Sequence, residues 1–261
     1  MLKKIQNKFI DSLTSLLGAI TFYTILPLPP HWPLKFQRLA RWAPLIGLGL
    51  GGGLGLGDEL LKLIGFPVGI RSALIIVLGI AITGGLHLDG VIDSADGLAV
   101  TDRQKRLIVM EDSVTGAFGV MAGVSVIVLK ILALGEISDY RWWGLMVAGG
   151  WGRWGQVSAI AFYPYLKPTG KGAFHKQQIR LPQDLCWGFL ALWGMSGLLA
   201  WLNPDLWGLG ATMGLMAMAI ALGVGAWFNQ RLGGHTGDTY GAVVEWTETL
   251  ILCVLTLVFS E

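Results

Sequence analysis

The sequence is poor in charged residues and in cysteine. Only 14% of its 261 residues are Asp, Glu, Lys or Arg, whereas 53% are hydrophobic, a balance outside that of soluble globular domains. The net charge is +2 and no basic stripe is present, so we expect no nucleic-acid partner. Cys186 and Cys253 stand in apolar runs without a CxxC pair and are predicted to be buried packing residues. The composition favours an integral membrane protein.

Three further absences narrow the chemistry. The glycine-rich stretch 47–57 has no GK[ST] sequence and follows no predicted strand, so we interpret it as close helix packing and not as a phosphate loop. His87 and His235 lack the HxxxH spacing of zinc enzymes, so each is predicted either to bind substrate or to be structural. The N-terminal apolar segment has polar interruptions and no cleavage site, so we expect it in the mature protein.

Apolar segments long enough to cross a bilayer dominate the chain. A membrane helix needs about 20 mostly apolar residues, and seven segments fit, near 43–64, 67–86, 114–134, 142–163, 184–203, 206–228 and 242–259. Residues 9–26 are a weaker eighth, which crosses, re-enters or lies in the interface. We predict an all-α, polytopic transmembrane helical bundle with about seven to eight membrane segments, in which residues 1–261 form a single integral membrane domain.

The four longer polar loops are predicted to share one membrane face, because two spans separate each loop from the next. They comprise residues 27–42, 87–113, 164–183 and 229–241, and they carry most of the Lys and Arg residues. Lysine and arginine concentrate in cytoplasmic loops. We therefore expect these loops in the cytoplasm.

One loop begins with three carboxylates at helical spacing, in Leu86-His-Leu-Asp-Gly-Val-Ile-Asp-Ser-Ala-Asp-Gly97. Asp89, Asp93 and Asp96 lie within about 60° of arc on one helix face. Adjacent anions near a membrane require compensating cations, and oxygen ligands favour Mg²⁺, Mn²⁺ or Ca²⁺ over zinc. We interpret the cluster as a metal site that receives a substrate phosphate. The alternative is a solvated acidic loop that caps a helix.

A second acidic segment, Met110-Glu-Asp-Ser-Val-Thr-Gly-Ala-Phe-Gly119, ends the same loop. The spans predicted on either side of the loop allow Glu111 and Asp112 to return toward the first cluster and complete a second cation site. Two metals would clamp a diphosphate. Asp112 is equally suited to cap the helix that follows.

Near the C-terminus, a glycine-rich segment spans residues 233–241. It brings His235, Thr236 and Asp238 to the face of the Asp cluster, where they offer hydrogen-bond donors and acceptors to a substrate. A structural glycine-rich turn is the alternative.

Two groups of cations complete the candidate residues. Arg153 lies within a predicted span, where a cation is costly unless it faces an anion; its partner is a substrate phosphate, a carboxylate of another span or an aromatic ring. Lys167, Lys171 and His175 surround residues 168–170. This basic patch reaches a phosphate or anchors the loop at the membrane.

In four segments the sequence resembles the adenosylcobinamide-GDP ribazoletransferase (cobalamin synthase) family. The first is Phe22-Tyr-Thr-Ile-Leu-Pro-Leu-Pro29, the next two are the acidic segments above, and the last is Gly234-His-Thr-Gly-Asp-Thr-Tyr-Gly-Ala242. The two acidic segments are specific, and the first segment is weak. Ile25 and Glu111 stand where the family often has basic residues, so no basic phosphate contact is expected at these two positions.

The resemblance implies an enzyme of vitamin B12 (cobalamin) biosynthesis in the bacterial inner membrane. Such a transferase joins adenosylcobinamide-GDP to α-ribazole or its 5′-phosphate and releases GMP, with Mg²⁺ as cofactor. The predicted metal ligands are Asp89, Asp93, Asp96 and Asp112, of which Asp93 or Asp112 is the candidate catalytic base. The predicted substrate-binding residues are His87, Arg153, Lys171, His235, Thr236 and Asp238. Whether the chain forms a homo-oligomer stays open.

Two other functions compete with this one. CDP-alcohol phosphotransferases also use Asp-rich membrane helices, but their DGxxAR continuation is missing, since Val-Ile-Asp follows Asp89-Gly90. An ion transporter would place its acids at mid-span, whereas here the acids gather at one loop face. Both alternatives are therefore disfavoured.

Overall fold

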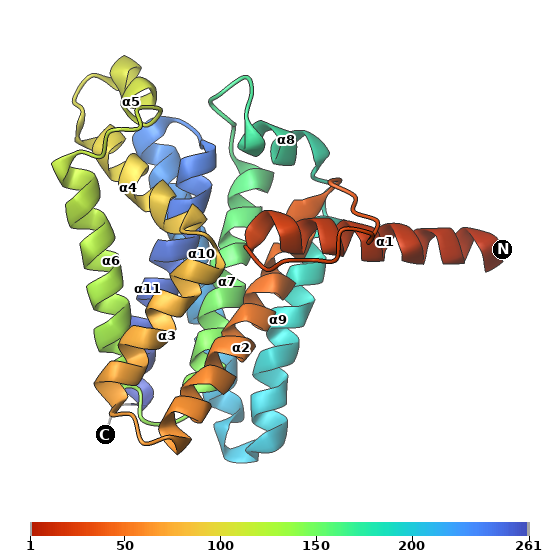
Figure 1. The fold of residues 1–261 in the computed structure, drawn as a ribbon, viewed down its shortest axis with the longest axis vertical. Helices are drawn as coiled ribbons and strands as arrows, with labels where there is room; N and C mark the ends of the chain where they lie inside the picture. The colour runs from red at the N-terminus through yellow and green to blue at the C-terminus, as the bar shows by residue number, and fades with distance from the viewer. Residues whose placement is uncertain (1, 260–261) are drawn as a thin grey trace.

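A computed structural model describes residues 2–259, apart from the side chains of residues 2–5, 7, 8 and 171. Every regular element in this range is a helix, as the sequence predicts (Figure 1). The helices are α1 (Leu2–Tyr23), η1 (Leu39–Trp42), α2 (Ala43–Leu63), α3 (Val68–Ile82), α4 (Leu86–Ala99), α5 (Arg103–Val109), α6 (Ala117–Glu136), α7 (Arg141–Phe162), α8 (Lys171–Gln178), α9 (Gln183–Leu202), η2 (Pro204–Leu206), α10 (Trp207–Leu232) and α11 (Gly237–Phe259).

Helix α7 is the central element of the bundle and packs against α2, α9, α10 and α11. Its contact with α2 is made through glycine: a Cβ atom on Gly47 would lie 2.1 Å from the carbonyl oxygen of Gly149, and one on Gly51 would lie 2.3 Å from that of Leu145. Small residues allow membrane helices to approach this closely. The glycine-rich stretch therefore serves packing, as predicted.

Four helical segments are long and apolar enough to cross a membrane: α6, α9, α11 and the stretch Pro204–Leu232, which contains α10. Helices α3 and α4 together form a fifth candidate that is bent by 89°. The chain is thus an all-helical protein with four to five candidate membrane spans. The mean hydropathy of helices α2 and α7 is too low for them to count among these candidates, because charged and glycine residues interrupt their apolar sequence.

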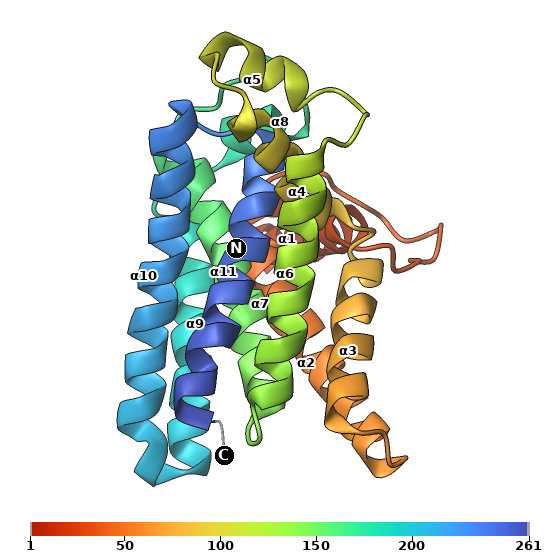
Figure 2. The ribbon, with the colours of Figure 1, turned by 90° about the vertical axis from the view of Figure 1, so that its left-hand side faces the viewer.

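Helix α1 lies across the bundle and not along it, as two perpendicular views show (Figures 1 and 2). One face of α1 exposes Phe9, Ile10 and Leu13. The other face holds the following loop, since the Ser15 hydroxyl donates a hydrogen bond to the Gln37 carbonyl. A helix with one apolar and one loop-bound face suits a membrane interface better than a span.

The polar loops gather at one end of the bundle, where α5, α8 and the turn between α10 and α11 lie together (Figures 1 and 2). The short turns between α2 and α3, α6 and α7, and α9 and α10 lie at the opposite end. Loop 27–42 runs beside α1 on the flank of the bundle. We refer to the first end as the loop end.

The prediction that both cysteines are buried is wrong. Cys186 on α9 is exposed and Cys253 on α11 is half-buried. Lipid tails cover the outer faces of membrane helices. An apolar run in such a helix therefore gives no information about burial within the protein.

Candidate active site

The helix that carries the Asp cluster starts at a sharp bend in the chain. Gly84 and Gly85 adopt left-handed conformations with φ of 62° and 71°, which glycine tolerates without steric cost. They turn the chain by 89° between α3 and α4. Helix α4 therefore leaves the path of α3 and packs between α6 and α11 toward the loop end (Figure 2).

Helix α4 is pressed against the start of α11 by two glycines. A Cβ atom on Gly90 would lie 2.3 Å from the Asp238 carbonyl oxygen, and one on Gly241 would lie 3.1 Å from the Cα atom of His87. The acidic segment and the C-terminal glycine-rich segment are thereby brought into direct contact.

The start of α6 is bound to α4 through Asp96. This buried carboxylate accepts hydrogen bonds of 2.7 Å from the backbone N–H groups of Gly116 and Gly119. A carboxylate at a helix N-terminus is stabilised by the unpaired N–H groups and the helix dipole. Asp96 thus joins the two acidic segments, and its oxygen atoms are engaged in that task.

The other three predicted metal ligands face solvent to different degrees. Asp89 is exposed, Asp93 is half-buried, and Asp112 is exposed and accepts a 3.1 Å hydrogen bond from the Val114 N–H. Within residues 2–259 no group of three or more His, Cys, Asp or Glu side chains is arranged to hold a metal ion. The site of four carboxylates stays a prediction. Asp89 and Asp93, one helical turn apart, are the pair that fits a cation bound by two carboxylates, water and a substrate phosphate.

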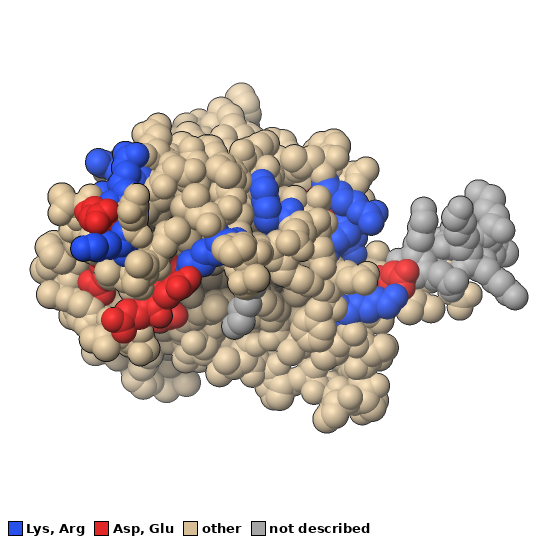
Figure 3. Space-filling model, turned by 90° about the horizontal axis from the view of Figure 1, so that it is seen from above, with Lys and Arg blue, Asp and Glu red and all other residues tan. Residues whose placement is uncertain are grey.

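A single lysine at the loop end connects two of the polar segments, the second acidic segment and the glycine-rich segment. The Lys167 Nζ atom lies 3.2 Å from Asp238 Oδ2 and 3.4 Å from Glu111 Oε1. Burial disfavours its charge, but the two carboxylates outweigh burial and raise its pKa. Seen from this end, acidic and basic side chains lie side by side (Figure 3). Lys167 is therefore a fixed cation next to the Asp cluster.

Two of the residues predicted to bind substrate are engaged within the protein. The ring nitrogens of buried His235 lie 3.0 Å from the Thr239 hydroxyl and 3.1 Å from the Gly225 carbonyl. The Thr236 hydroxyl accepts a 3.3 Å hydrogen bond from the Thr239 N–H and donates one to Asp238. These contacts cap α11. They hold Asp238 in place beside Lys167.

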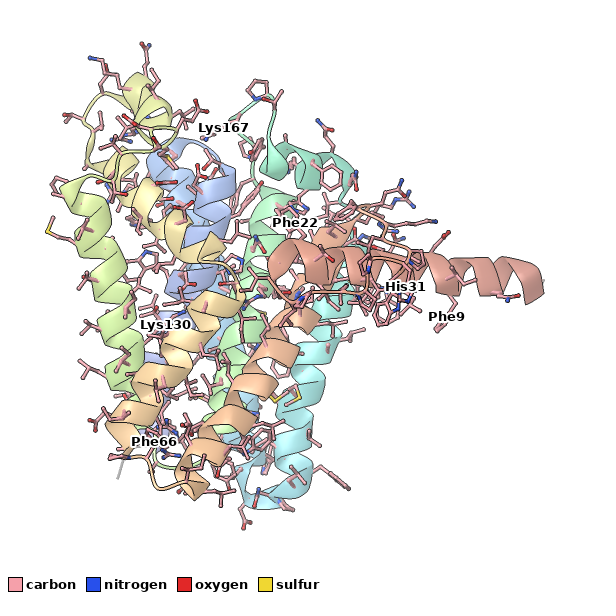
Figure 4. The ribbon with its side chains drawn as sticks, in the orientation of Figure 1. Phe9, Phe22, His31, Phe66, Lys130 and Lys167 are labelled. Carbon is pink, nitrogen blue, oxygen red and sulfur yellow. The ribbon has the colours of Figure 1, made fainter. Side chains whose placement is uncertain are left out.

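Arg153 pairs with a carboxylate of another helix, which is one of the partners considered for it above. Its guanidinium donates to Glu248 at 2.7 Å, and Glu248 and Glu245 each lie 2.5 Å from Lys130. Lys130 lies well below Lys167 along the bundle (Figure 4). The side chain of Lys171, also predicted to bind substrate, lies outside the described residues.

A pocket of about 270 Å³ opens next to Asp89 and Asp238. His87, Gln156, His175 and Tyr240 line it, and each is buried and has side-chain polar atoms without a hydrogen-bond partner among the described residues. Sequence reasoning named His87 and His175 but missed the other two. Tyr240 could have been recognised from the sequence, since it lies in the Gly234–Ala242 segment. Gln156 lies in an apolar span, and nothing in the sequence around it indicates a binding residue.

Comparison with known proteins places this arrangement in a family. The family described as cobalamin-5-phosphate synthase matches residues 15–256, which include all the segments above. The chain belongs to the cobalamin-5-phosphate synthase family. A relative from Trichormus variabilis named adenosylcobinamide-GDP ribazoletransferase is 56% identical over 94% of this chain and 97% of its own length. One of the same name from Synechocystis is 51% identical, over 92% and 94%. No solved structure matches the chain.

In this cobalamin-5-phosphate synthase family member, the site combines three chemical resources. Asp89 and Asp93 supply anionic oxygen atoms, Lys167 supplies a cation, and the adjacent pocket supplies buried polar groups. Such a set of groups is suited to binding a phosphate-containing substrate and to stabilising charge as a phosphoryl group moves.

Proposed function

We propose that this chain transfers the adenosylcobinamide phosphoryl group from adenosylcobinamide-GDP to α-ribazole or its 5′-phosphate, releasing GMP. The relatives are named for this transferase, and the chain matches them over nearly their whole length. The observation that supports it most strongly is the meeting of the three polar segments at the loop end, through Asp96, Lys167 and the contact of Gly90 with Asp238.

We further propose that Mg²⁺ assists the transfer and that Asp89 and Asp93 hold it. A bound Mg²⁺ would neutralise charge on the diphosphate. The carboxylate pair supports this, since neither Asp89 nor Asp93 forms an ion pair with any side chain that the structure describes. In this proposal Asp96 acts as a positioning residue that keeps α4 against α6.

The remaining side chains of the site would bind and orient the substrate. Lys167 would attract the phosphate oxygens, and its ammonium group would be held by the hydrogen bond that it donates to Asp238. Asp93 or Asp112 would accept the proton of the attacking hydroxyl. Most of the rate enhancement would come from positioning and from electrostatic stabilisation of the transferring group.

We propose that the chain is one inner-membrane domain with seven to eight membrane segments and a cytoplasmic loop end. Helices α2 and α7 have 21 and 22 residues, which gives lengths of about 30 Å, enough to cross a hydrocarbon core. The charges within α7 pair with α2 and α11 and do not face lipid. The excess of Lys and Arg in the long loops supports the orientation.

The test is product formation by the purified, detergent-solubilised protein from adenosylcobinamide-GDP and α-ribazole, with and without Mg²⁺. We expect cobalamin and GMP only with Mg²⁺, and a loss of roughly 10³-fold or more in the Asp93→Asn variant. Asp102→Asn is the matched control, since Asp102 is an exposed acid that caps α5 in the same loop. A well-folded wild-type protein that makes no cobalamin with Mg²⁺ would disprove the reaction.

A further inference from the structure

The pocket beside the Asp cluster contains more unpaired polar groups than a folded protein normally tolerates. His87, Gln156, His175 and Tyr240 are 1%, 6%, 4% and 2% exposed. Both ring nitrogens of each histidine, the Gln156 Oε1 atom and the Tyr240 hydroxyl have no hydrogen-bond partner among the described residues. Buried polar groups are almost always paired, and an unpaired group is costly. Their convergence on one pocket indicates a polar ligand.

The walls of the pocket suit a flat aromatic ligand. Phe22, Tyr165 and Tyr240 line it together with the polar groups, and the rings of Tyr165 and Tyr240 stack with centroids 5.8 Å apart. Burial lowers the pKa of His175 to about 4, so its imidazole is neutral at pH 7 and offers one donor and one acceptor. The interior is therefore neutral, polar and partly aromatic.

The size of the pocket limits what enters it. A volume of about 270 Å³ is close to that of one nucleoside and far below that of a corrin macrocycle. The charged groups Lys167, Asp89 and Asp238 are also among the lining residues, so phosphate would stay beside Lys167 at the charged side while a base and sugar enter.

We infer that this pocket binds the guanine nucleoside of the GDP-linked substrate. The inference rests on the proposed function, which offers two nucleosides, guanosine and α-ribazole. Guanine presents donors and acceptors along its edge, whereas the benzimidazole of α-ribazole is almost entirely apolar there. A site built from polar groups rejects a ligand that leaves them unpaired. The unpaired atoms of His87, Gln156, His175 and Tyr240 therefore select guanine.

This assignment orients the donor substrate in the site. With guanosine in the pocket, the diphosphate lies at its mouth between Asp89 and Lys167, and the corrin part stays outside. The α-ribazole must then approach from the open side of the carboxylates, so that its hydroxyl reaches the phosphorus opposite the departing GMP.

Equilibrium binding of GMP, AMP and α-ribazole to the full-length protein in detergent tests the inference without any turnover. We expect GMP to bind at least about tenfold more tightly than AMP. Two variants remove unpaired atoms with little change in shape: Gln156→Leu, and His175→Phe, which keeps an aromatic ring against Phe22 and Tyr23. Each should weaken GMP binding about fivefold and leave α-ribazole binding unchanged. The midpoint of thermal unfolding should stay the same or rise.

Ser196→Ala is the matched control, because Ser196 is also buried with an unpaired hydroxyl but lies on α9 against α10. It should not alter GMP binding. Equal affinities for GMP and AMP, unchanged GMP binding in both pocket variants, or weakened binding of α-ribazole instead would each overturn the inference. So would inhibition by GMP that is not competitive with adenosylcobinamide-GDP. If GMP binds as expected but no cobalamin forms, the proposed reaction fails and the guanine pocket stands.

Discussion

The middle of the bundle and its loop end treat charge in opposite ways. In the middle, Lys130 lies between Glu245 and Glu248, and nearer the end opposite the loop end Asp58 pairs with Arg141 at 2.7 Å. At the loop end, Asp89 and Asp93 form no ion pair within the described residues, and the adjacent pocket keeps polar atoms unpaired. Charges in the bundle are neutralised by partners in the fold, whereas the carboxylates proposed to serve a substrate have no such partner among the described residues.

The strongest test of this comparison removes a cation from the middle. Lys130→Met leaves two carboxylates buried without their shared partner, which costs about 3–5 kcal/mol of unfolding free energy. Lys35→Met is the control, since Lys35 pairs with Asp11 at the surface, and should change stability by less than about 1 kcal/mol. Denaturant unfolding in detergent measures both. Equal effects of the two variants would contradict the distinction.

Acid should destabilise the loop end through its buried histidines. Burial lowers the pKa values of His175 and His235 from 6.5 to about 4, so between these values the unfolded chain binds more protons than the folded one. Stability is therefore full above pH 6.5 and falls as the pH decreases toward 4, by up to about 3 kcal/mol per histidine. Unfolding midpoints measured from pH 7.5 to 4.5 should fall less steeply in His175→Phe. An unchanged slope in that variant would refute the role of His175.

A smaller loss is expected where Asp96 joins α4 to α6. Asp96→Asn replaces the carboxylate that accepts hydrogen bonds from two backbone N–H groups at the start of α6. The variant should lower the free energy of unfolding by about 1–3 kcal/mol. Hydrogen exchange should rise at residues 116–120 before it rises elsewhere. If Asp96 were instead needed mainly for metal, stability would stay unchanged and the Mg²⁺ concentration for half-maximal activity would increase.

Local patterns in the sequence predicted much of this architecture. Apolar lengths gave the helices, and the spacing of Asp89, Asp93 and Asp96 gave a carboxylate-bearing helix, because both depend on residues close in the chain. The partners of these residues depend on distant packing. Asp96 is engaged by Gly116 and Gly119, and Arg153 by a carboxylate 95 residues away.

The pocket was the least predictable part of the site. Gln156 lies among apolar residues of α7. Only the packing of α7 against α8 and α11, and of α11 against α4, shows that Gln156 shares a pocket with unpaired histidines. The cysteine prediction failed for a related reason, since the helices packed against α9 leave Cys186 exposed. Helix spacing reports which residues share a face, and tertiary packing decides what that face meets.

The mildest change in stability is expected at Lys167, which belongs to the loop end although it has two carboxylate partners. Its side chain is 18% exposed and that of Glu111 is 63% exposed, so Lys167→Met should alter the unfolding free energy by less than about 1 kcal/mol. If its charge serves the substrate diphosphate, the same variant should lose roughly tenfold or more in kcat/KM for adenosylcobinamide-GDP, while KM for α-ribazole stays constant. Lys105→Met, an exposed lysine paired with Asp102 in the same end, should change neither quantity. If Lys167→Met instead lowers the unfolding free energy strongly and leaves kcat/KM unchanged, Lys167 stabilises the fold and does not serve the substrate. The region in which charges are neutralised by the fold would then extend into the loop end.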